Sequence, residues 1–153
     1  MDFSVLFQSS NPSYGFHHFG CRIGIDPEGF VYLSLGDRLA ENSAQDVDTH
    51  LGTVIRLNRD GSIPADNPFV GQESARPEIF TFGHRNPQGM AIHPDTGAVW
   101  TNEHGPQGGD EINILSAGEN YGWPLLTYGE QYGGGEIGIG TRAPGFADSV
   151  WHW

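Results

Sequence analysis

Short runs in which apolar and polar residues alternate recur along the chain, and Gly, Pro, Asn or Asp bounds each run. Alternation with a period of two, in runs of roughly 4–8 residues, is typical of β-strands. The pattern predicts strands in residues 30–37, at the start of 51–62, and in 77–85, 98–105 and 110–115. No long stretch has helical periodicity, and we expect at most one helical turn, within 39–48.

The hydrophobic pattern also repeats over a long period. The stretch "GIDPEGFVYLSLGD" (24–37) resembles "AIHPDTGAVWTNEHG" (91–105), at an offset of 67 residues. A polar loop and a third strand follow each copy, "TVIRLN" (53–58) in one and "EINIL" (111–115) in the other. A fourth strand, "EIFTFG" (78–83), closes the first unit. Four antiparallel strands in each repeat are the signature of a propeller blade.

The number of predicted strands bears on the whole architecture. Propellers usually have about 4–8 blades, whereas this sequence accounts for about two and a half blades of four-stranded antiparallel sheet. We therefore expect an all-β fold in which residues 1–153 form one partial propeller domain. The remaining blades, or self-association, would complete it. A single β-sandwich is the alternative, and it explains the strands but not the long-period repeat.

The negative charge of the chain limits the classes of partner that it can bind. Nineteen acidic residues face seven basic ones, all of them Arg, and the net charge is −12. Phosphate backbones and anionic lipids repel such a chain, so we expect neither nucleic acid nor a membrane surface as a partner. The excess of carboxylates suits hard cations such as calcium.

Several features concern compartment and redox state. The single cysteine, Cys21, excludes an intrachain disulfide, and we expect it to be a small buried hydrophobic residue. No apolar run approaches the ~18 residues of a membrane span. The first ten residues, "MDFSVLFQSS", have an acidic start and no basic segment, so we expect no signal peptide in this chain.

The first candidate constellation joins "HHFGCR" (17–22) to Asp37. His18 stands at the entrance of one strand and Asp37 at the end of the next, so a hairpin would bring the two together. A carboxylate beside an imidazole fixes its tautomer and raises its basicity, as a general base requires. The alternative is a His–Asp pair that only ties a turn.

The second constellation is "GHRNPQGMA" (83–91), in which Arg85 and Asn86 precede a new strand. The guanidinium of Arg85 offers a planar set of donors suited to carboxylates or quinone oxygens. The alternative is an arginine that satisfies loop carbonyls.

The third constellation is "EHGPQGGDE" (103–111). It lacks the ending of a P-loop and the spacing of an EF-hand. Gly105 and Pro106 expose carbonyl oxygens, and Asp110 and Glu111 supply carboxylates, which together suit calcium. The alternative is a solvated acidic turn.

These stretches have a common resemblance. "HHFGCR", "YLSLGD", "GTVIRLNRDGSIPADNPF", "GHRNPQGMA" and "NEHGPQGGDEINILSAGENYGWP" resemble, in this order, the hallmarks of soluble quinone-dependent sugar dehydrogenases. This is the glucose/sorbosone dehydrogenase family, and the sequence is most similar to its aldose sugar dehydrogenase branch over residues 17–132. The resemblance implies a six-bladed β-propeller that binds pyrroloquinoline quinone (PQQ) and calcium over its central channel. It also implies a periplasmic or secreted protein.

The resemblance implies roles for individual residues. His18 matches the general base that takes the proton of the C1 hydroxyl of an aldose while hydride passes to the quinone, and Asp37 matches the acid that orients it. Arg85 matches the arginine on the quinone oxygens. Gly105 and Pro106 match the pair whose carbonyls hold the calcium of the cofactor.

Further positions follow from the same resemblance. Glu111 matches a ligand of a second, structural calcium, and Tyr121 matches another through its carbonyl. Asp110 would lie beside the cofactor, and Tyr132 aligns with a tyrosine that contacts PQQ. His104 stands where glucose dehydrogenases carry Gln, although the aldose branch also has His there.

Two departures weaken the expected cofactor site. The glutamine of the first blade that touches PQQ is absent, and so is the Lys and Arg pair of a late blade that holds the cofactor carboxylates. The resemblance implies an enzyme that passes electrons from an aldose to an electron acceptor. A non-catalytic propeller that binds a partner and a calcium-dependent lactone hydrolase are the alternatives.

Overall fold

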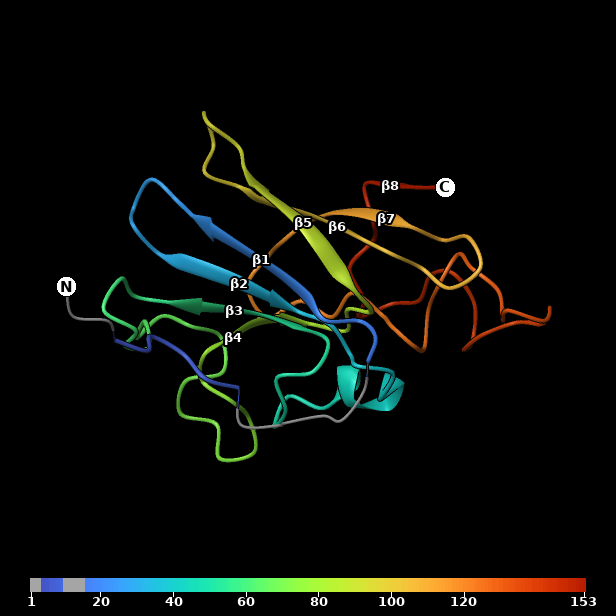
Figure 1. Ribbon diagram of the computed structural model, residues 1–153, viewed down its shortest axis with the longest axis horizontal. Helices are drawn as coiled ribbons and strands as arrows, with labels where there is room; N and C mark the ends of the chain where they lie inside the picture. Colours follow the sequence, from blue (N-terminus) through green and yellow to red (C-terminus); the bar gives the residue numbers. More distant parts are fainter. Residues whose placement is uncertain (1–3, 10–15) are drawn as a thin grey trace.

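The structure is a computed structural model that describes residues 4–9 and 16–153, and two antiparallel sheets dominate it (Figure 1). Each sheet has four strands in sequential order. The strands of the first sheet are β1 (Gly20–Ile25), β2 (Val31–Leu35), β3 (Thr53–Leu57) and β4 (Ile79–Phe82). Those of the second are β5 (Pro87–Ile92), β6 (Val99–Glu103), β7 (Glu111–Ile114) and β8 (Trp151–His152). Two such sheets confirm the all-β, blade-like prediction.

The repeated stretch forms the same element in both sheets. β1 and β2 make a hairpin in which Ile25 pairs with Val31, and β5 and β6 make one in which Ile92 pairs with Val99. β1 and β5 lie side by side in Figure 1, as the innermost strands of neighbouring blades do. The predicted helical turn is a short 3₁₀ helix, η1 (Glu41–Gln45). Our sequence patterns did not predict the two-residue strand β8.

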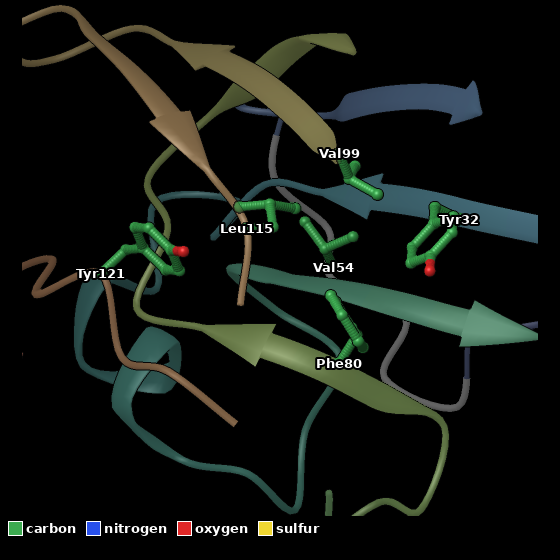
Figure 2. Packing of buried hydrophobic residues seen from close by; sticks show 6 residues of the cluster. All are labelled: Tyr32, Val54, Phe80, Val99, Leu115 and Tyr121. Carbon is green, nitrogen blue, oxygen red and sulfur yellow. The ribbon is translucent and has the colours of Figure 1, made fainter. Parts of the chain in front are cut away.

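The main hydrophobic core lies between the two sheets. Figure 2 shows Tyr32, Val54 and Phe80 of the first sheet packed with Val99 of β6 and with Leu115 and Tyr121, which follow β7. Tyr32 and Phe80 meet edge to face, with ring centroids 5.3 Å apart. This shared core fixes how one sheet lies against the other, and so how their ends align.

One prediction about the core is wrong. Cys21 is exposed rather than buried. It lies where the β1–β2 register shifts, between Gly20 and Ile23, and its φ is 77°. The bulge turns its side chain away from the core, and periodicity alone does not reveal a bulge.

Among residues 4–9 and 16–153, no helix has the length and apolar character needed to cross a membrane.

Candidate active site

The predicted chemistry gathers at one end of the two hairpins. His18 precedes β1 and Asp37 follows β2, so the antiparallel ladder brings them together, and Arg85 and His104 stand in the same places around β5 and β6. The backbone N–H of Asp37 donates to the carbonyl of Arg85 at 2.9 Å. This bond ties the functional end of the first hairpin to that of the second.

His18 and Asp37 form the pair predicted from the sequence. Nδ1 of His18 lies 2.6 Å from Oδ1 of Asp37, whose residue is fully buried. A carboxylate only accepts hydrogen bonds, so Nδ1 carries a proton, and in the neutral imidazole Nε2 is then the acceptor. The arrangement leaves Nε2 able to accept a proton from a substrate.

The carboxylate of Asp37 is held from two further sides. The backbone N–H of Leu39 donates to Oδ1 at 2.9 Å. The indole N–H of Trp123 donates to Oδ2 at 2.7 Å, although 86 residues separate the two. Each oxygen of this buried carboxylate therefore has a donor, as a buried charge requires.

Arg85 is buried beside this group. Its Nη1 donates to the carbonyls of His104 and Gly105, and its Cζ lies 5.2 Å from the centre of the Trp123 ring. Part of the guanidinium thus satisfies loop carbonyls, as the alternative interpretation expects. Nε of Arg85 is buried and has no acceptor among the described residues. An unsatisfied buried donor on a cation fits an anionic oxygen such as that of a quinone cofactor.

Two acidic residues, Glu103 and Glu111, form a pair next to Arg85. Glu103 accepts the backbone N–H of Arg85 at 2.7 Å, Nδ1 of His84 at 2.9 Å and the side-chain amide of Asn113 at 3.0 Å. Burial raises the pKa of the neighbouring Glu111 to about 8, and the charge of Glu103 adds to this effect. Two close buried carboxylates favour a cation between or beside them.

The acidic pair borders a small cavity of about 10 Å³. That is about the volume one water-sized group needs. Gly105, Glu111 and Tyr121, three of the four predicted metal ligands, line this cavity together with Glu103. The described residues contain no cluster of three or more His, Cys, Asp and Glu side chains in ligand geometry. Any calcium here would therefore depend on backbone carbonyls as well as on the two glutamates, which fits the donor set calcium accepts.

The loop between β6 and β7 is ordered by its own polar groups. Asp110 accepts the backbone N–H of Gly105 at 3.0 Å, and its other oxygen lies 3.0 Å from Nδ1 of His104. A Cβ at Gly105 would lie 2.3 Å from the carbonyl oxygens of Gly108 and Gly109, so the turn requires glycine there. The segment is a structured turn rather than a freely solvated acidic one.

The remaining predicted positions lie apart from this cluster. Tyr132 is 72% exposed, in the long segment between β7 and β8. Pro106 is buried but does not line the small cavity. These residues keep their predicted roles as predictions.

Three residues of the site were missed by the sequence patterns: Trp123, Glu103 and His84. The partner of Trp123, Asp37, lies 86 residues away along the chain, whereas His84 and Glu103 are 19 residues apart, as His18 and Asp37 are. For Trp123 the available signal was the Trp in "NYGWP", a large residue in a polar loop, and for His84 and Glu103 it was the spacing shared with His18 and Asp37.

Comparison with known proteins supports this picture. A family model described as Glucose / Sorbosone dehydrogenase matches residues 1–153. Aldose sugar dehydrogenase YliI of Escherichia coli (strain K12) is 46% identical over 152 residues, which are 95% of this chain and 41% of that protein.

Solved structures agree with the sequence matches. The apo-form of the soluble aldose sugar dehydrogenase from Escherichia coli superposes with a TM-score of 0.95 at 44% identity, covering 99% of this chain and 44% of that one. The PQQ-bound form of the aldose sugar dehydrogenase from Streptomyces coelicolor gives 0.72 at 32% identity, covering 91% and 36%. The chain thus spans less than half the length of the relatives it matches.

Proposed function

The chain belongs to the glucose/sorbosone dehydrogenase family, and we propose that the protein oxidises an aldose at C1 to the lactone with PQQ as its cofactor. The observation that carries the proposal is the His18–Asp37 pair. It combines a short hydrogen bond, a fully buried carboxylate and an imidazole whose Nε2 is left as the acceptor.

His18 would act as the general base. Its Nε2 takes the proton of the C1 hydroxyl, the C1–H bond breaks with its electron pair, and a C1=O bond forms. Asp37 stabilises the imidazolium that results and keeps the ring in the required tautomer. When bound, PQQ supplies the acceptor for the departing hydride.

Arg85 would stabilise negative charge that develops on the cofactor. Its guanidinium is buried and keeps the unsatisfied Nε described above. A fixed cation in a site that excludes water acts strongly on developing charge. We further propose that His104, Asp110 and Tyr132 contact the cofactor, a role that rests on the family resemblance alone.

Calcium would bind in two ways. The carbonyls of Gly105 and Pro106 would hold the cofactor's calcium, and Glu111 with the carbonyl of Tyr121 would hold a structural one. The small cavity bordered by Gly105, Glu111 and Tyr121 supports a cation in this region. A periplasmic or secreted location and a separate electron acceptor are further proposals, and both rest on the family.

Reconstitution tests this function. The complete propeller that contains this chain would be supplied with PQQ and calcium, and dye reduction would be followed with a panel of aldoses. We expect PQQ-dependent reduction with at least one aldose and none without PQQ. Release of acid from a lactone without any quinone would instead identify a hydrolase. PQQ binding without turnover of any aldose would indicate a binding module.

A further inference from the structure

Trp123 contacts two functional residues of the site, Asp37 and Arg85. Its indole N–H donates to Oδ2 of Asp37 at 2.7 Å, and its ring centre lies 5.2 Å from Cζ of Arg85. We propose that Trp123 is a positioning residue that fixes Asp37 and thereby sets the tautomer and direction of His18. The inference rests on the proposed base role of His18.

Asp37 needs the indole because it is fully buried. Its Oδ1 already accepts from Nδ1 of His18 and from the backbone N–H of Leu39, so the indole is the donor on Oδ2. Without that donor a buried charged oxygen would lose its partner, which is costly. The carboxylate would then turn or admit water, and either change would release Nδ1 of His18.

Trp123 is itself held rigidly. Its backbone N–H donates to the carbonyl of Gly83 at 2.9 Å, and its carbonyl accepts from Nε2 of Gln45 at 2.7 Å. The ring packs with Ala44 and Ile137 in a small core of its own and is 4% exposed.

The 3₁₀ helix η1 therefore supports the active site indirectly. Gln45 also exchanges two side-chain hydrogen bonds with Asn120, at 2.7 and 3.0 Å. Asn120 in turn accepts the backbone N–H of Gly122 at 2.9 Å, next to Trp123. The helix η1, in the loop between β2 and β3, thus fixes the turn that carries Trp123. Trp123 in turn fixes Asp37, which orients His18.

The test removes the indole N–H and keeps an aromatic ring at position 123. Trp123→Phe removes the N–H, and Trp100→Phe is the matched control. The Trp100 N–H is buried and has no acceptor among the described residues, so the control removes an indole donor that bonds nothing there. Both variants would be made in the complete propeller.

Two readouts separate positioning from a general structural effect. The ¹⁵N chemical shifts of the His18 ring, measured without cofactor, report its tautomer. We expect the Nδ1–H form to lose population in Trp123→Phe and to stay unchanged in Trp100→Phe. With PQQ bound, kcat should fall more than KM changes, by about 10-fold or more but less than the ~10²–10⁴-fold of a missing base.

A double-mutant cycle sharpens the inference. If Trp123 acts through Asp37, then Trp123→Phe should lower kcat strongly in the natural background and little in an Asp37→Asn background. Equal losses in the two backgrounds would overturn the proposal. Gln45→Ala loosens the turn without changing the Trp123 ring. It should lower the population of the Nδ1–H tautomer of His18 as Trp123→Phe does, but to a smaller extent. It replaces Trp123→Phe if that variant does not fold.

The outcomes distinguish this inference from the proposed function. A changed His18 tautomer in a protein that oxidises no aldose would leave the positioning role intact and reject the dehydrogenase. Normal His18 shifts and normal kcat in Trp123→Phe, with aldose oxidation intact, would reject the positioning role alone.

Discussion

Nδ1 of His18 lies 2.6 Å from Oδ1 of Asp37, and the carboxylate behind that bond has no exposed surface. The pair sits at the open end of the β1–β2 hairpin, where one residue enters the ladder and the other leaves it. Burial keeps water from competing for the carboxylate, which favours this hydrogen bond and the tautomer whose acceptor is Nε2.

This geometry predicts different losses for the two partners. In a complete propeller, His18→Gln should keep PQQ binding, followed by the absorbance of the bound cofactor, and should lose ~10²–10⁴-fold in turnover. Asp37→Asn should lose less, because it disturbs orientation and leaves the base in place. A His18→Gln enzyme with near wild-type turnover at saturating sugar would contradict the base role.

The hairpin-based part of the site could be predicted from the sequence because it is local. Alternation located β2 and β6, whereas β1 and β5 were expected from the strand entrances at "HHFGCR" and "GHRNPQGMA". A ladder fixes which residues meet at its ends, so His18 and Asp37 were predicted as a pair. The 67-residue repeat extended the same reasoning to the second sheet.

The rest depends on contacts between loops that no periodicity encodes. The hydrogen bond from Trp123 to Asp37 requires the whole second sheet to be in place first. The Glu103–His84 bond, by contrast, has the same 19-residue spacing as His18–Asp37 and lies at the end of the second hairpin, so the hairpin reasoning extends to it. The exposure of Cys21 follows from a bulge, which shifts the register without changing the residue pattern.

Glu111 predicts a pH dependence of stability. Its pKa is about 8 in the folded chain, because of burial first and Glu103 second, against an ordinary value of 4.5. Between these values the folded state holds a proton that the unfolded state has lost. Without calcium, the free energy of unfolding should therefore fall as pH rises from about 4.5 to about 8. Glu111→Gln should flatten this dependence in thermal melts.

Calcium should offset that loss. It binds the ionised carboxylate and the folded state, so the increase in Tm that it causes should be larger at pH 8.5 than at pH 6. Glu73→Gln, at an exposed loop position, is the matched control and should respond as the natural protein does. Melting curves that a chelator leaves unchanged at both pH values would rule out the structural calcium.

Gly83 packs closely against the turn that carries Trp123, so we predict that this position requires glycine. A Cβ there would lie 2.1 Å from Oδ1 of Asn120 and 2.7 Å from the backbone N of Gly122. Its φ is +78°, while Gly71 has φ +82° and open space around it. Gly71→Ala should therefore cost only the ~1–2 kcal/mol of the left-handed conformation.

Gly83→Ala should cost more than Gly71→Ala by about 1–3 kcal/mol, because the added methyl group overpacks the turn that carries Trp123. Chemical denaturation of both variants measures the difference. Equal costs would mean that this turn moves aside freely, and would weaken the rigid support described for Trp123.

The last prediction concerns residues 1–153 produced alone. The edge strands β1, β5 and β8 each have a strand partner on one side only among the described residues, and open edges pair with other chains. Apolar side chains near these edges are also exposed, among them Ile23 at 66% and Trp151 at 64%. We expect self-association in size-exclusion chromatography with light scattering, and no PQQ-dependent aldose oxidation even with calcium.

A charge on an edge should reduce this association, since natural edge strands use charges to prevent pairing. Ile23→Lys on β1 should shift the chain toward monomer, whereas Ile63→Lys, in a loop outside the strands and 41% exposed, should do so less. An association that rebuilds a ring and restores activity would support the site assignments in a different assembly. A stable monomer that oxidises an aldose would show that two sheets suffice, and that the cofactor carboxylates are held by the arginines of this chain.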